Sequence, residues 1–263
     1  MPVQEFPKVR LDIEGAVATL TLDDQPVLNA IGPTMQKGLK AALDALEASS
    51  ARALVLTGAG RAFSTGANLS EAGEGGRIPT VRDTLELGYH PMLRRLKMLQ
   101  MPLIVAVNGA AAGVGMSFAL MGDIILAARS AYFLQAFVRI GLVPDGGSTW
   151  LLPRLIGMAR AKELAMLGEK LSAEKALEWG LVNRVVDDGA LIAEARALAE
   201  KLSQGPTRAF AMMRQAYWAS LDNPYERQLD LEAELQSRAS RTEDFREGVA
   251  AFLDKRPAKF SGK

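Results

Sequence analysis

The 263-residue sequence contains no cysteine, which excludes disulfide bonds, thiolate catalysis and cysteine-ligated metal sites. It contains one histidine, His90, so we expect neither a histidine-rich metal site nor a serine–histidine catalytic triad. No unbroken run of about 18 apolar residues occurs, and the N-terminus lacks the apolar segment of a signal peptide. We therefore expect a soluble, cytoplasmic protein that holds no metal and does not bind a membrane.

The sequence also lacks an excess of charge of either sign. It has 31 basic and 30 acidic residues, for a formal net charge of +1. A balance this close to zero argues against nucleic acid or a membrane surface as the main partner. With 49% hydrophobic residues, the chain is expected to be globular, with one large domain or slightly more.

Strand patterns alternate with helical patterns over the first part of the chain. Residues 9–13 and 16–22 are predicted to form a hairpin. Alternating strands and helices predict an α/β fold with a mostly parallel sheet and helices outside it. Buried strands are expected at 53–57, 103–107 and 124–127. Helices are expected at 31–46, 81–99 and 114–121, and a mobile loop is expected at 71–77.

From about residue 159 the pattern becomes almost entirely helical, with one brief extended segment at 181–186. Apolar stripes on these helices would pack against the core or against another subunit. We therefore divide the chain into a core of residues 1–200 and a helical C-terminal region of residues 201–263.

Residues 104–123 run from an apolar strand through a Gly/Ala loop into an apolar helix. A glycine-rich turn at a helix N-terminus presents free backbone N–H groups, which stabilise negative charge. The spacing fits neither a P-loop nor a dinucleotide-binding fingerprint. The pattern alone leaves two interpretations open, a plain strand-to-helix connection and an anion site made by the backbone.

Asp145 follows Pro144 and precedes two glycines. Aspartate in this setting is typical of a turn, or of an N-cap for a helix that begins near Ser148. A catalytic carboxylate is the alternative, and the local sequence does not choose between them.

Four segments together resemble the crotonase (enoyl-CoA hydratase/isomerase) superfamily: 25–31 (QPVLNAI), 60–69 (GRAFSTGANL), 108–115 (NGAAAGVG) and 141–150 (GLVPDGGSTW). The resemblance spans nearly the full length. It implies a spiral of ββα units with a helical C-terminal region that builds homotrimers, often paired into hexamers. It also implies acyl-CoA substrates, with coenzyme A as part of the substrate and no separate cofactor.

The resemblance assigns roles to particular residues. The backbone N–H groups of Ala67 and Val114 would hold the thioester oxygen, and removal of such a donor typically costs about 10²–10³ in rate. Gly66 and Gly113 would let the backbone approach the ligand closely. The other substrate-binding residues that it implies are Thr65, Asn68 and Leu69 on the adenine side, and Phe137, Leu142 and Trp150 around the acyl group.

Hydratases of this superfamily use two glutamates, and by alignment of the loops these positions hold Ser117 and Phe137. This departure argues against hydration. Some superfamily members place their working carboxylate at the position of Asp145, where apolar neighbours would raise its pKa. The motifs are closest to the branch of 1,2-epoxyphenylacetyl-CoA isomerases, which predicts an isomerase with Asp145 as acid/base. Hydration, dehalogenation, thioester hydrolysis and acyl-CoA binding without turnover remain open.

Two further features have open interpretations. The basic C-terminal residues Lys255, Arg256 and Lys259, with Phe260, resemble a tail that reaches a bound nucleotide, but a solvated tail would have the same composition. His90 would either line the acyl pocket or serve a structural role at a helix start.

Overall fold

The computed structural model of the chain describes residues 3–71 and 80–263. Within these residues the strands form a seven-stranded sheet, in the order β1-β2-β3-β4-β6-β8-β11, and a four-stranded sheet, in the order β10-β9-β7-β5. The strands are β1 (Gln4–Phe6), β2 (Val9–Glu14), β3 (Val17–Leu22), β4 (Ala53–Gly58), β5 (Ala62–Ser64), β6 (Leu103–Val107), β7 (Ala110–Ala112), β8 (Ile124–Ala128), β9 (Tyr132–Leu134), β10 (Lys170–Ser172) and β11 (Arg184–Val186).

The large sheet follows from the apolar patterning of its strands. β2 alternates buried and more exposed positions and pairs antiparallel with β3, which confirms the predicted hairpin. β4 and β6 are buried along their whole length, as expected for central strands covered on both faces. β3, β4, β6 and β8 pair in parallel, so the predicted parallel sheet is confirmed.

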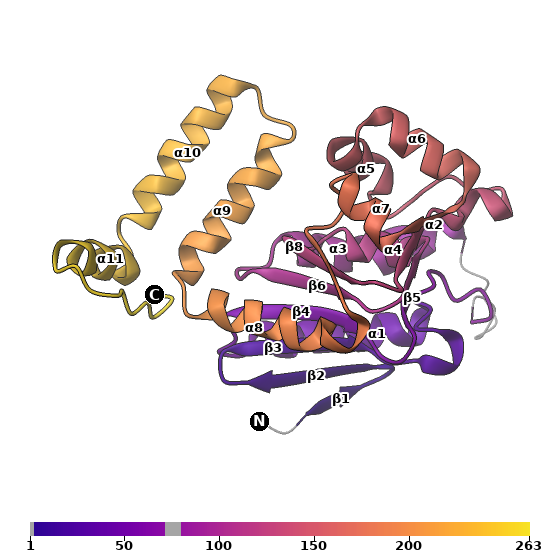
Figure 1. Cartoon of the computed structure of the whole chain (residues 1–263), viewed down its shortest axis with the longest axis horizontal. Coiled ribbons are helices and arrows are strands. Elements are labelled where there is room, and N and C mark those ends of the chain that lie inside the picture. Colours follow the sequence, from indigo (N-terminus) through magenta and orange to yellow (C-terminus); the bar gives the residue numbers. More distant parts are fainter. Residues whose placement is uncertain (1–2, 72–79) are drawn as a thin grey trace.

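Successive strand pairs divide between the two sheets. β4, β6 and β8 lie in the large sheet, and the strand that follows each of them, β5, β7 or β9, lies in the small sheet. A helical segment follows each pair, so the chain winds as a spiral of ββα units (Figure 1). The helices are α1 (Pro33–Glu47), α2 (Val81–Asp83), α3 (His90–Lys97), α4 (Val114–Ala119), α5 (Ser148–Ile156), α6 (Met158–Leu167), α7 (Ala173–Glu178), α8 (Leu191–Ser203), α9 (Thr207–Ser220), α10 (Tyr225–Ala239) and α11 (Glu243–Leu253).

The helix expected at 81–99 is a continuous helical segment with a π-helical turn, η2 (Thr84–Tyr89), between α2 and α3. Pro91 follows this turn and has no N–H to continue an α-helical ladder, so an irregular turn is favoured here. Apart from Glu71, the loop predicted at 71–77 lies outside the described residues.

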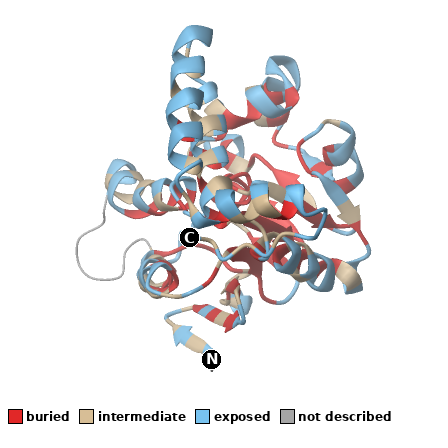
Figure 2. Ribbon diagram, turned by 90° about the vertical axis from the view of Figure 1, so that its left-hand side faces the viewer, coloured by how far each residue is buried: buried red, intermediate tan, exposed pale blue. Residues whose placement is uncertain are grey.

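The C-terminal helices extend away from the sheets. Figure 1 shows α8 lying along the large sheet, whereas α9, α10 and α11 stand to one side of it. Buried residues concentrate around the sheets and the C-terminal helices are mostly exposed (Figure 2). The division at residue 200 stays a prediction, and α8 spans it. No helix among the described residues has the length and apolar character needed to cross a bilayer.

Two contacts attach α9 to the core. The buried Arg214 guanidinium pairs with Asp123 and donates to the Leu96 carbonyl at 2.7 Å, so its two terminal nitrogens have partners. Further along α9, the Trp218 ring stacks on Trp150 of α5 at a centroid distance of 5.7 Å. These contacts place the end of α9 beside the loop that carries Asp145.

Candidate active site

Three loops of the candidate site follow three neighbouring strands of the small sheet. Ala67 follows β5, Val114 follows β7, and Asp145 follows β9 through the short helix η3 (Ala136–Ile140). β5, β7 and β9 pair in parallel. Because the carboxyl ends of parallel strands meet at one edge of a sheet, the fold brings these three segments together.

The Ala67 N–H is left free by the pairing of its neighbours. Ile31 donates to the Gly66 carbonyl at 2.6 Å and accepts from the Asn68 N–H at 3.4 Å, so it brackets Ala67 in a parallel bridge. In such a bridge the N–H of the bracketed residue points to the opposite side. Among the described residues nothing accepts a hydrogen bond from the Ala67 N–H.

Val114 is the first residue of α4, and its N–H also has no acceptor among the described residues. The N-cap Gly113 has φ +52° and donates to the Leu134 carbonyl at 2.9 Å. Since the first N–H groups of a helix have no intrahelical acceptor, this N–H is available to a ligand. Gly66 has φ +99°, and a Cβ there would lie 2.8 Å from the Ala112 carbonyl oxygen, so the two donor loops pack directly against each other.

The main chain of Asp145 is held by two serines. Its carbonyl oxygen lies 3.0 Å from Ser117 Oγ and 2.8 Å from Ser148 Oγ, and it accepts from the Ser148 N–H at 3.0 Å. The two hydroxyl oxygens also lie 2.7 Å apart. Because each hydroxyl has a single proton, one of them donates to the other, which in turn donates to the carbonyl. The turn interpretation therefore holds for the main chain. The N-cap interpretation is wrong, because α5 begins after Gly147 without a side-chain cap.

The carboxylate of Asp145 is left without a partner. Its Oδ1 is buried and accepts no hydrogen bond from the described residues. Burial raises the pKa of Asp145 to about 6, because desolvation disfavours the charged form. A carboxylate that is poorly solvated and ionises near neutral pH is suited to accept a proton.

The resemblance also implies aromatic residues around the acyl group, and the structure places them in two different settings. The Phe137 ring is buried, and its tip lies 3.8 Å from the position that a Cβ on Gly113 would take, so it packs beside the N-terminal end of α4. Trp150 and His90 line a cavity of about 400 Å³ next to Gly146 and Gly147.

Of the residues predicted to lie on the adenine side, Thr65 donates from Oγ1 to the Leu28 carbonyl at 3.3 Å, and Asn68 accepts at Oδ1 from Ser70 Oγ at 2.6 Å. Leu69 is exposed next to them. Leu142 is 42% exposed and lines a separate apolar groove with Val143. The exposed side chains of Leu142 and Val143 therefore do not shield Asp145 from solvent.

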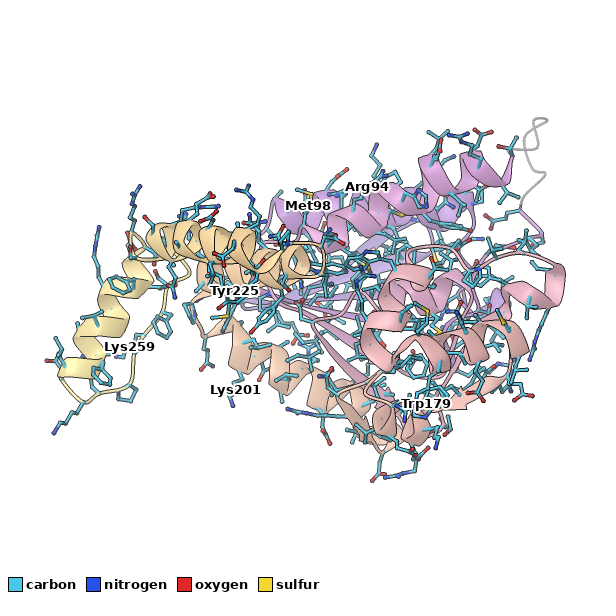
Figure 3. The ribbon with its side chains drawn as sticks, turned by 90° about the horizontal axis from the view of Figure 1, so that it is seen from above. Arg94, Met98, Trp179, Lys201, Tyr225 and Lys259 are labelled. Carbon is cyan, nitrogen blue, oxygen red and sulfur yellow. The ribbon has the colours of Figure 1, made fainter. Side chains whose placement is uncertain are left out.

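The basic tail lies far from this site. Arg256 makes a two-point ion pair with Glu247 of α11, at 2.7 and 2.9 Å, and lowers the pKa of Glu247 to about 2. Figure 3 places Lys259 at the free end of the C-terminal helices, across the molecule from Trp179. Figure 1 shows α11 on the opposite side of the molecule from α5, which follows the Asp145 loop, so the tail of one chain does not approach its own Asp145 loop.

Two residues that the sequence did not single out as site residues join segments of the candidate site by hydrogen bonds. Ser117 would pass as a small residue on a packed helix, but its hydroxyl ties α4 to the Asp145 loop. Tyr89 is buried and its hydroxyl donates to the Ile31 carbonyl at 3.0 Å. Neither hydrogen bond has a sequence signal, because each joins segments far apart in the chain.

Comparison with known proteins gives consistent matches over the whole chain. Residues 12–263 match the family model described as enoyl-CoA hydratase/isomerase. The chain is 46% identical to a protein of Rhodobacter capsulatus named "Probable enoyl-CoA hydratase", over 97% of this chain and 98% of that one. It is also 46% identical to the 1,2-epoxyphenylacetyl-CoA isomerase of Escherichia coli K12, over 95% and 97%. The crystal structure of an enoyl-CoA hydratase from Bacillus anthracis superposes with a TM-score of 0.91 at 30% identity, over 97% of this chain and 100% of that one.

Proposed function

The chain belongs to the enoyl-CoA hydratase/isomerase family, and we propose that within it this protein isomerises acyl-CoA thioesters through an enolate, with Asp145 as acid/base. The observation that carries the proposal is the half-buried carboxylate of Asp145, whose buried Oδ1 has no hydrogen-bond partner among the described residues, next to two loops with free backbone N–H groups. Its sequence similarity to an isomerase supports the same conclusion, and the similarity to a probable hydratase keeps hydration as the alternative.

In the proposed reaction, the N–H groups of Ala67 and Val114 donate to the thioester oxygen. Asp145 takes a proton from the carbon next to the thioester, and the electrons of that C–H bond form an enolate. The two N–H groups stabilise the negative charge on its oxygen. The protonated Asp145 then returns the proton to a more distant carbon, which moves the double bond and leaves the carboxylate ready for another cycle.

Hydration would need a second carboxylate to hold and activate water. The two positions that supply glutamates in hydratases are Ser117, whose hydroxyl is engaged with Ser148, and Phe137, whose ring packs near Gly113. Neither side chain can accept a proton from water. A single acid/base suits a reaction in which one proton leaves and returns.

We further propose that residues 65–69 bind the adenine side of coenzyme A and that the cavity lined by Trp150 and His90 receives the acyl group. This cavity lies directly beside Gly146 and Gly147, which follow the acid. Its lining combines apolar side chains, the stacked rings of Trp150 and Trp218 with Leu93, with the charged residues Arg94, Lys97 and Asp222. We propose that the apolar part contacts the acyl group.

The function is tested by incubating the protein with a 3-enoyl-CoA and, separately, a 2-enoyl-CoA, and analysing the products by mass spectrometry and chromatography. Isomerisation converts each compound into the other without a change in mass. Hydration adds the mass of one water to the 2-enoyl-CoA. Rapid hydration without interconversion would establish the alternative and overturn the proposal.

The rate should depend on pH through the ionisation of Asp145. The base must be ionised, and burial raises its pKa to about 6, so kcat/KM is expected to fall as the pH drops through that value. Well below it, the rate should fall about tenfold per pH unit, with a plateau above about pH 7. A pH–rate profile with a 3-enoyl-CoA measures this, and a profile that stays flat between about pH 5 and pH 8 would contradict it.

We propose that the chain assembles as a homotrimer or as a hexamer of two trimers. Tyr217, Tyr225, Phe252 and Leu253 on α9 to α11 expose large apolar surface, which is unusual for a monomer. Light scattering after gel filtration is expected to give a mass of three or six chains of 28.3 kDa. A monomer mass would contradict this expectation.

A further inference from the structure

The proposed reaction assigns no role to the buried hydroxyl of Tyr89, which lies next to the site. It is 3% exposed, and its hydroxyl donates to the carbonyl of Ile31 at 3.0 Å. A hydroxyl buried at this depth loses its hydrogen bonds to water, so its one protein partner fixes where the ring end lies.

The π-helical turn directs Tyr89 inward. Tyr89 is the last residue of η2, and the His90 N–H donates to the Leu85 carbonyl, five residues back. Gly88 is buried against Gln36 of α1, where a Cβ would lie 2.7 Å from the Gln36 side-chain oxygen. This packing holds the turn against the start of α1, and π-turns of this kind often occur at functional sites.

The partner of Tyr89 is the residue that sets the direction of the Ala67 N–H. Ile31 brackets Ala67 through its own N–H and carbonyl, and that carbonyl accepts both the Asn68 N–H and the Tyr89 hydroxyl. Of these two bonds the one from Tyr89 is the shorter, 3.0 Å against 3.4 Å. The hydroxyl therefore holds the carbonyl that orients the Ala67 segment.

We propose that Tyr89 is a positioning residue whose hydroxyl, through Ile31, aims the Ala67 N–H at the thioester oxygen. The inference rests on the proposed function, since it assigns a role within the same oxyanion site. A donor must lie within hydrogen-bond distance of the developing oxyanion, and small misplacements in such a site reduce the rate strongly.

The electrostatic surroundings keep Tyr89 in its donor form. Burial raises the pKa of Tyr89, and the negative charge of Asp145 raises it further. The hydroxyl therefore stays protonated over the pH range in which Asp145 ionises. The influence of Asp145 on this pKa also means that the Tyr89 hydroxyl lies near the acid.

The test is the variant Tyr89→Phe, which removes the hydroxyl and keeps the ring. With a 3-enoyl-CoA, kcat is expected to fall about tenfold, with KM changed less than about threefold. The specific readout is the infrared band of the thioester carbonyl in bound phenylacetyl-CoA, labelled with carbon-13 at that carbonyl. Wild-type protein is expected to shift this band to lower frequency on binding, and Tyr89→Phe to give a smaller shift.

Thr57→Val is the matched control. Thr57 is 4% exposed and donates from its hydroxyl to the Ala106 carbonyl at 2.8 Å within the large sheet. Both variants lose one buried hydroxyl-to-carbonyl hydrogen bond, so both are expected to lower Tm, but Thr57→Val should leave the carbonyl band and kcat unchanged. A Tyr89→Phe band equal to that of the wild type would overturn the inference alone. Absence of any shift in the wild type would overturn the proposed oxyanion site, and this inference with it.

Site-specific 3-fluorotyrosine at position 89 keeps the test decisive if Tyr89→Phe does not fold. This residue retains the ring, and its fluorine makes the hydroxyl a stronger donor, so the band shift is expected to exceed that of the wild type. A band shift equal to or smaller than that of the wild type would contradict the positioning role.

Discussion

Replacement of Asp145 by asparagine is expected to lower kcat for isomerisation by about 10²–10⁴-fold, because the amide cannot accept the proton that the reaction must move. Asparagine has nearly the same shape, so the serine contacts to the main chain of residue 145 should persist. Since the carboxylate is not among the proposed donors to the thioester oxygen, the dissociation constant for phenylacetyl-CoA should change by less than about threefold. Steady-state kinetics and calorimetry measure the two quantities.

The stability of the same variant distinguishes a lost base from a damaged fold. Burial raises the pKa of Asp145 to about 6, so the folded protein favours the protonated form. The resulting stabilisation is present at low pH and is lost as the pH rises through that value. At about pH 8, Asp145→Asn replaces a half-buried carboxylate by a neutral amide, and its Tm should be about 2–4 °C above that of the wild type. A lower Tm with lost activity would indicate misfolding instead.

The variant Val114→Pro is expected to lower kcat by about 10²–10³-fold, because proline has no N–H to donate to the oxyanion. Val114 is the first residue of α4, a position where proline is well tolerated since the N–H has no intrahelical acceptor. The preceding residue is Gly113, which has no side chain to clash with the proline ring. The variant therefore removes one donor with little change to the helix.

Two variants control for Val114→Pro. Val114→Ala loses side-chain packing but keeps the N–H, and it is expected to lower kcat by less than about fivefold. Met158→Pro places proline at the same position of α6, also after a glycine, on an exposed residue outside the site. If Val114→Pro kept more than about a third of wild-type kcat in a folded protein, the N–H of residue 114 would not be an oxyanion donor.

The sequence predicted the large sheet well because its strands have strong patterns. β6 is an uninterrupted apolar run and β4 is apolar up to Thr57, and both strands lie within one residue of the predicted ranges. The small sheet was largely missed. β5, β7 and β10 have three residues each, too few to establish a period of two, and Ala110–Ala112 has no strand preference of its own.

The site was predicted in part for a similar reason. The resemblance named Asp145, Ala67 and Val114, and the structure brings their loops to one edge of the small sheet. The contacts that hold them, Tyr89 to Ile31 and Ser117 to Asp145, join residues 58 and 28 positions apart. Such contacts depend on how the spiral stacks its turns, which no local pattern encodes. The apolar surroundings expected for Asp145 were only partly correct, since Leu142 and Val143 are exposed.

The central claim is that Asp145 removes the proton next to a thioester, and deuterium exchange tests it most directly. Phenylacetyl-CoA in D₂O has no double bond that the reaction could shift or hydrate along its acyl chain, so uptake of deuterium at the carbon beside the thioester reports enolate formation alone. Wild-type protein is expected to introduce deuterium there, and Asp145→Asn to do so at least about 10²-fold more slowly. Equal exchange by the two proteins, or no exchange by a wild type that hydrates 2-enoyl-CoA, would contradict the account.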